Sequence, residues 1–214
     1  MPKTPTPEDV IIPALRDGDA ATVGEWAWCA LRTVVPGRTT APAVRHPLEF
    51  TCLPLYRHGH SGLCLHVWPQ DEEMVSPVVH AHSWDLWSYV LCGTVFNQVV
   101  TVSDCAERPE HRLYEARSVG RVDAIRATER LVSCTPQAPQ EIPVGGIYRL
   151  SSGVFHRSGH RGLTATIVLG EHHAERQNLV LGPLDAAPRP DLPRVACPPH
   201  EVRDLVQRIL DLQS

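Results

Sequence analysis

Two histidines separated by one residue, His80 and His82, precede an alternating apolar run that ends at Gly93. The side-chain period of a β-strand is two, so on a strand both imidazoles project from the same face. Such a pair can bind one metal ion, but metal sites in proteins normally use at least three protein ligands. The spacing therefore predicts a metal site that a third residue must complete.

His156 is the predicted third ligand. It follows a strand-like segment, residues 147–150, and a Ser-Ser-Gly turn, and it stands at the start of another strand pattern. In a small antiparallel barrel, a hairpin of this kind can place its histidine opposite a histidine on a distant strand. A single histidine in such a place is more often structural, and the upstream His-x-His pair is what favours the ligand role.

The segments that must position these histidines read as strands. Eight short runs are rich in β-branched and aromatic residues and are separated by Gly, Pro, Asn, Asp or Ser. Many strands without intervening helices predict an all-β fold, an antiparallel barrel or sandwich. The predicted strands cover residues 50–57, 62–68, 84–91, 95–102, 111–116, 147–150, 163–169 and 178–181.

Helices are predicted on both sides of the strands. Apolar residues fall at helical spacing from Val23 to Val34, and a preceding helix that starts after Thr6 should be delayed or broken at Pro13. A proline-rich stretch after Pro183 should run extended, and the amphipathic helix that follows Pro198 should dock on the barrel or on a second subunit of a homodimer. The expected segments are a helical segment at 1–42, a barrel at 43–183, and a linker with a C-terminal helix at 184–214.

The composition argues against nucleic-acid and membrane partners. The 214 residues are 43% hydrophobic and carry a net charge of −4 with mixed signs, so no basic stripe for nucleic acid is evident. No apolar stretch approaches the length of a membrane span, and we expect a cytoplasmic protein without a membrane partner. Seven cysteines without a C-x-x-C pair predict reduced, mostly buried thiols.

Residues 76–93 resemble the first motif of the cupins, His-x-His followed by a strand that ends Val-Leu-x-Gly, and residues 148–156 resemble the second motif. The resemblance implies a cupin-type double-stranded β-helix, a small antiparallel barrel. Cupins usually supply a glutamate from the first motif, and here that position is Leu86, with Trp87 beside it. The site is therefore similar to that of the three-histidine subgroup, which includes thiol dioxygenases such as cysteine dioxygenase.

The same resemblance extends to a substrate site. Tyr56-Arg57 precedes the histidines much as a thiol-dioxygenase arginine that holds the substrate carboxylate does, and this implies a role for Arg57 and Tyr56 in the active site. A guanidinium is a rigid bidentate partner for a carboxylate, whereas the structural alternative is an arginine at a strand end in solvent. The polar relay of those enzymes is replaced by Thr166-x-Val168-x-Gly170, which implies a different substrate or reaction.

These features predict a mononuclear non-heme iron(II) oxygenase that acts with dioxygen on a small polar metabolite, such as an amino acid or thiol. Zinc, nickel and copper remain alternatives because imidazole binds all of them. The competing function is a non-oxidative metal-dependent cupin, an isomerase or lyase, or a ligand-binding cupin. The roles of four residues near the motifs stay open at this point: Trp84, Trp87, Asn97 and Glu171.

Overall fold

The computed structural model describes residues 7–34, 42–119, 122–187 and 191–213. The helices are α1 (Pro7–Asp17), α2 (Ala20–Val34) and α3 (Pro199–Asp211). The strands are β1 (Val44–Arg45), β2 (Thr51–His58), β3 (Ser61–Trp68), β4 (Glu73–Val75), β5 (His80–Ala81), β6 (Trp84–Asp104), β7 (His111–Val119), β8 (Val122–Pro136), β9 (Gln140–Ile142), β10 (Ile147–Leu150), β11 (His156–His172), β12 (Asn178–Gly182), β13 (Leu192–Pro193) and β14 (Val195–Ala196).

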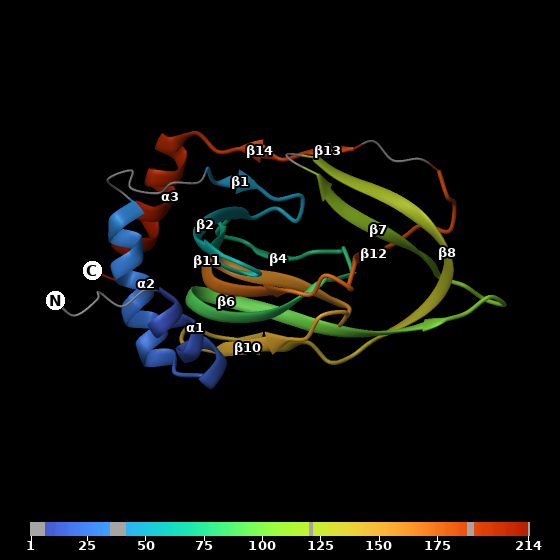
Figure 1. The fold of residues 1–214 in the computed structure, drawn as a ribbon, viewed down its shortest axis with the longest axis horizontal. Coiled ribbons are helices and arrows are strands. Elements are labelled where there is room, and N and C mark those ends of the chain that lie inside the picture. Colours follow the sequence, from blue (N-terminus) through green and yellow to red (C-terminus); the bar gives the residue numbers. More distant parts are fainter. Residues whose placement is uncertain (1–6, 35–41, 120–121, 188–190, 214) are drawn as a thin grey trace.

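The strands form one antiparallel, strongly bent sheet, as the all-β prediction requires. Its order is β10-β6-β8-β7-β12-β5-β11-β3-β2-β1-β14, and an additional pairing joins β6 directly to β11. The strands therefore enclose an interior instead of forming a flat layer. Figure 1 shows the three helices together on one side of the strands, and β7 and β8 on the opposite side.

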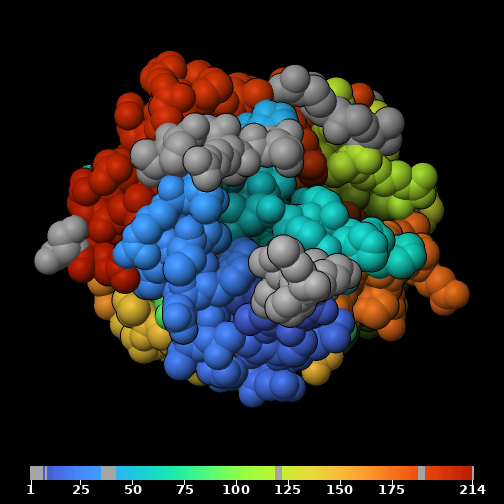
Figure 2. Space-filling view, turned by 60° about the vertical axis from the view of Figure 1, so that its left-hand side comes forward, coloured from blue at the N-terminus to red at the C-terminus, as the bar shows by residue number. Residues whose placement is uncertain are grey.

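The helices share a core with the outer face of the barrel. Leu63 and Leu65 of β3 and Ile167 of β11 are fully buried and belong to the same apolar cluster as Leu31 of α2 and Ile209 of α3. Figure 2 shows the blue helices α1 and α2 bordering the teal hairpin of β2 and β3, with red α3 beside them. Because side chains alternate along a strand, the intervening residues of β3 must face the barrel interior.

The C-terminal segment docks on the barrel, the first of the two alternatives that its apolar stripe left open. Helix α3 buries Val206 and Ile209 in the common cluster. Ahead of it, β13 pairs with β8 and β14 pairs with β1, so this segment runs extended along two strands. Residues 188–190 of the predicted linker lie outside the described part of the chain.

Several elements differ from those that the sequence predicts. Strand β8 was not predicted, because its many charged side chains are partly exposed and mask the strand pattern. Helix α1 continues through Pro13, whose side chain is exposed, instead of breaking there. Strand β11 begins at His156 and not near Leu163, so His160 is a buried strand residue.

The predicted strands 84–91 and 95–102 are one continuous strand, β6, that bends at Gly93. Gly93 has a φ of +72°, which side-chain-bearing residues rarely adopt. The bend brings the Thr94 amide within 3.3 Å of the Thr164 hydroxyl of β11, to which it donates a hydrogen bond. The two halves of β6 can thus follow the curvature of the barrel. None of the helices among the described residues combines the length and apolar character that a membrane crossing requires.

Candidate metal centre and its cavity

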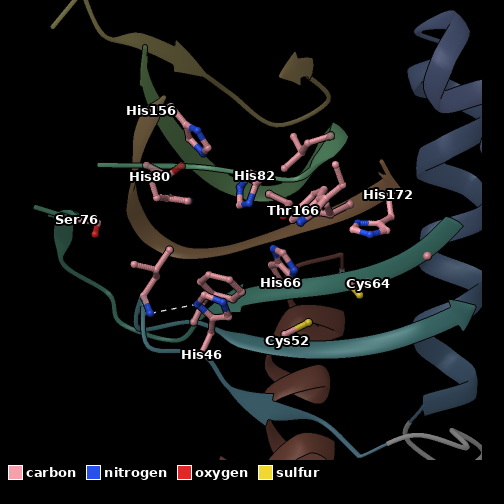
Figure 3. Close-up of a pocket in the computed structure, with 18 of the residues that line it drawn as sticks. His46, Cys52, Cys64, His66, Ser76, His80, His82, His156, Thr166 and His172 are labelled. Atoms are coloured by element: carbon pink, nitrogen blue, oxygen red, sulfur yellow. Dashed lines mark hydrogen bonds between the residues drawn. The ribbon is translucent and has the colours of Figure 1, made fainter. Parts of the chain in front are cut away.

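The structure brings the three predicted ligands together. His80 lies in β5, His82 lies between β5 and β6, and His156 is the first residue of β11, directly opposite His80 in the ladder. The ring centroids are 4.4 Å apart for His80 and His156, 4.8 Å for His80 and His82, and 5.1 Å for His82 and His156. One potential ligand nitrogen of each ring lies within 4.8 Å of the other two. Figure 3 shows the three rings converging at one end of a cavity.

Burial keeps these rings in the form that binds metal. Desolvation lowers the pKa of His80, lowers the pKa of His82 well below its ordinary value, and, with the nearby His80, lowers the pKa of His156 to about 3. The imidazoles are therefore neutral near pH 7, and each has a nitrogen lone pair for a metal ion.

Backbone carbonyls orient two of the rings. The Nδ1 atoms of His80 and His156 lie 3.3 Å from the carbonyl oxygens of Val78 and Val154. A carbonyl can only accept a hydrogen bond, so this contact favours the proton on Nδ1 and leaves Nε2 as the ligand atom. Three neutral nitrogen donors at this spacing fit a divalent transition-metal ion with positions open to the cavity.

The cavity has a volume of about 350 Å³. Seven histidines, Arg57 and Arg194 line it, and none of the described residues that line it is Asp or Glu. Beyond the three candidate ligands, the histidines are His46, His60, His66 and His172. With no carboxylate in its wall, the cavity favours anionic over cationic guests.

Strand β6 continues the alternation of the histidine motif without a bulge. Trp84 and Leu86 line the cavity on the same face as the candidate ligands, and the Trp84 ring lies 4.1 Å from that of His82. Trp87 instead packs in the helix-covered core. The position that corresponds to the glutamate of the first cupin motif is therefore an apolar wall beside the candidate metal centre.

A β-bulge determines how Arg57 and Tyr56 are oriented. The register passes from Pro54 opposite Cys64 to Tyr56 opposite Leu63, so Leu55 is left without a partner. After the bulge the two faces of β2 exchange. Arg57, an exposed residue, consequently lines the cavity at its mouth, whereas Tyr56 packs against the helix-covered core and lies outside the cavity wall.

The contacts of Arg57 leave its charge available. Its Nη2 atom lies 3.5 Å from the Cys64 sulfur, and no Asp or Glu of the described chain is within ion-pairing distance of it. Arg194, the other arginine of the cavity, differs because its Nε donates to both carboxylate oxygens of Asp123 at 2.9 Å. Arg57 is thus the better placed of the two to bind an incoming anion.

Other residues on the strands around the candidate centre lie either in the cavity wall or outside it. His66 and Trp68 line the cavity, as alternation along β3 predicts. Asn97 and Thr101 are outside its wall. Glu171, whose role the sequence left open, points outward and forms an ion pair with Arg16 of α1, because its neighbours Gly170 and His172 occupy the inward positions.

Several cavity residues carry no sequence signal that would identify them. His46 follows β1, and its ring stacks on Phe50 at 4.3 Å while burial lowers its pKa to about 3. Arg194 lies between β13 and β14, about 110 residues beyond the histidine pair. Cys52 and Cys64, expected only as reduced thiols, both line the cavity. A thiol contact between them lowers the pKa of Cys64, an effect that is reinforced by His66 and Arg57, and raises the pKa of Cys52.

The comparisons with known proteins bear only on the fold. No protein-family model matches the sequence, and no curated protein matches it. Similar solved structures include a cupin-2 domain protein from Shewanella frigidimarina NCIMB 400, with 14% identity over 57% of this chain and 79% of the other and a TM-score of 0.30. The fold is cupin-like. That description rests on the antiparallel barrel and on the three histidines inside it.

Two other similar structures are enzymes. Hydroxypropylphosphonic acid epoxidase from S. wedmorenis is 11% identical over 62% of this chain and 55% of the other, with a TM-score of 0.37. Hydroquinone 1,2-dioxygenase in complex with Cd²⁺ and 4-hydroxybenzonitrile is 10% identical over 67% of this chain and 72% of the other, with a TM-score of 0.38. Similarity this distant does not assign a substrate, so function must be argued from the residues of this cavity.

Proposed function

We propose that the protein is a mononuclear non-heme iron(II) oxygenase that acts on a small metabolite bearing a carboxylate, such as an amino acid or a thiol acid. The observation that carries the proposal is the convergence of three neutral imidazoles, from buried His80 and His156 and partly buried His82, in a cavity whose described lining has no carboxylate. Such a ligand set leaves the full double charge on a divalent ion and leaves coordination positions open. Iron(II) held by these imidazoles would mediate the transfer of electrons from the substrate to dioxygen.

The chain's own residues would bind the substrate and restrict water. Arg57 at the mouth offers a guanidinium to a carboxylate. At the other end, the uncompensated double charge of an ion held by the three neutral histidines would favour a second anionic or electron-rich group of the substrate. Leu86 and Val168 form an apolar cluster beside the histidines, where a carboxylate ligand would otherwise stand. This wall limits water access and strengthens electrostatic interactions within the cavity.

Oxygen uptake tests this function. Protein loaded anaerobically with one equivalent of iron(II) is expected to consume oxygen on addition of a suitable thiol or amino acid, at least about tenfold faster than without the addition, which corresponds to about 1.4 kcal/mol in barrier. Zinc-loaded protein, the control for the same fold without redox chemistry, should consume none. Turnover that needs no oxygen, or zinc as the sole active metal, would instead support an isomerase or lyase.

Arg57→Gln tests the anchoring role. We expect the substitution to weaken binding of carboxylate substrates about 10- to 100-fold, because one charge-assisted contact contributes about 1.5–3 kcal/mol. Binding is measured by calorimetric titration of the metal-loaded protein with the substrate found by oxygen uptake. Arg117→Gln, a surface arginine paired with Glu115, is the matched control. Equal affinities in both variants, or lost metal in Arg57→Gln, would contradict the role.

A further inference from the structure

A second cluster of metal-binding side chains lies on the cavity wall formed by β2 and β3. Cys52, Cys64 and His66 each offer a sulfur or ring nitrogen within 4.8 Å of the other two. Cys52 is directly opposite His66 in the β2–β3 ladder, and Cys64 is the adjacent inward-facing residue of β3. Figure 3 shows these three side chains on the two strands that face the three-histidine centre. The alternation of β3 therefore places two donors on one face, and strand pairing adds the third.

We propose that Cys52, Cys64 and His66 form a second metal site, suited to a borderline-soft divalent ion such as Zn²⁺. Two thiolates and one imidazole are a donor set typical of zinc, and they select against hard ions such as Mg²⁺ and Ca²⁺. Zinc lies about 2.3 Å from sulfur and about 2.0 Å from nitrogen in such sites, so ligand atoms are roughly 3.5–3.8 Å apart. The three donor atoms lie within 4.8 Å of one another, so the side chains have to close by at most about 1.3 Å to reach that geometry. All three side chains line the cavity, so a fourth ligand would approach from the cavity side.

The surroundings favour a cation bound by thiolates. Two thiolates neutralise a divalent ion, and the Arg57 guanidinium, 3.5 Å from the Cys64 sulfur, stabilises the anionic form of that ligand. The ring of Phe50 packs 4.4 Å from that of His66 and restricts its orientation. Cys64 is only 7% exposed, so bulk water competes weakly for its sulfur.

An unsatisfied hydroxyl lies beside the same site. Thr166 of β11 is directly opposite His66 in the β3–β11 ladder and lines the cavity. It is 1% exposed, and its Oγ1 atom has no hydrogen-bond partner within the described part of the chain. A buried polar group without a partner is costly, and a water molecule in the fourth position of the ion would provide that partner.

Cobalt(II) distinguishes the two sites because only the second contains sulfur. Reduced protein titrated anaerobically with Co²⁺ is expected to bind about two ions per chain and to develop a near-ultraviolet sulfur-to-cobalt absorption band. The His156→Ala variant should keep that band while it binds about one ion, so the sulfur-containing site is tested independently of the three-histidine site. Added Zn²⁺ should displace cobalt and bleach the band.

Serine variants of the two cysteines test whether the cluster binds the second cobalt ion. Cys52→Ser and Cys64→Ser are each expected to remove the band and to lower cobalt binding from about two ions to about one, with circular dichroism confirming a folded barrel. Cys29→Ser, an exposed cysteine of α2, is the matched control and should bind like wild type. A reduced wild-type protein without the band, or an unchanged band in Cys64→Ser, would overturn the second site.

Discussion

Replacing His156 with alanine should abolish stoichiometric binding of iron(II). The substitution removes one of three nitrogen donors, and the two that remain hold a metal ion poorly, so we expect an affinity loss of at least about 100-fold. The barrel should stay folded because His156 belongs to none of the apolar clusters. Bound iron is measured by metal analysis after anaerobic loading with one equivalent and desalting.

A background without the two cavity thiols and a matched histidine variant make this result specific to His156. Cys52 and Cys64 are replaced by serine in all samples, so thiolates contribute nothing to the iron that is counted. His172→Ala is the matched control, because His172 lines the same cavity but its Nδ1 atom lies 3.2 Å from the Ser83 hydroxyl, outside the converging set. Full iron occupancy in the His156 variant, or equal loss in both, would show the ligand assignment to be wrong.

Gly93→Ala should strongly destabilise the barrel. A Cβ atom at this position would clash with the Thr164 hydroxyl and would lie 2.6 Å from the Leu163 carbonyl oxygen and 2.8 Å from the Thr164 Cα atom. Two of these neighbours are backbone atoms of β11 and cannot move without breaking the β6–β11 pairing. We expect a loss of about 4 kcal/mol or more in the free energy of unfolding, measured by urea denaturation.

Gly145→Ala separates crowding from backbone strain. Gly145 also has a positive φ, +81°, but no heavy atom lies within 4 Å of the Cβ that alanine would add. Its substitution should therefore cost only about 1–2 kcal/mol, the strain of a left-handed conformation. Equal destabilisation of the two variants would contradict the argument that close packing of β11 on the bend of β6 requires glycine at position 93.

The sequence by itself determined the features that depend on local periodicity. A His-x-His pair on a strand must share one face, and this placed His80 and His82 together before any tertiary contact was considered. The same regular alternation continues in β6 and β3, where Trp84, Leu86 and His66 line the cavity. The stripe after Pro198 likewise predicted a helix that buries one face. These properties follow from the geometry of consecutive residues.

Only the tertiary structure decided the rest of the site. The bulge at Leu55 arises where β2 pairs with β3, and it turns Arg57 toward the cavity and Tyr56 away from it. The proximity of Cys52 to Cys64 depends on the same register, and Arg194 reaches the cavity through pairings of β13 and β14 with distant strands. Strand register and long-range pairing are set by cross-strand packing and hydrogen bonds. Residue spacing along a single segment does not contain that information.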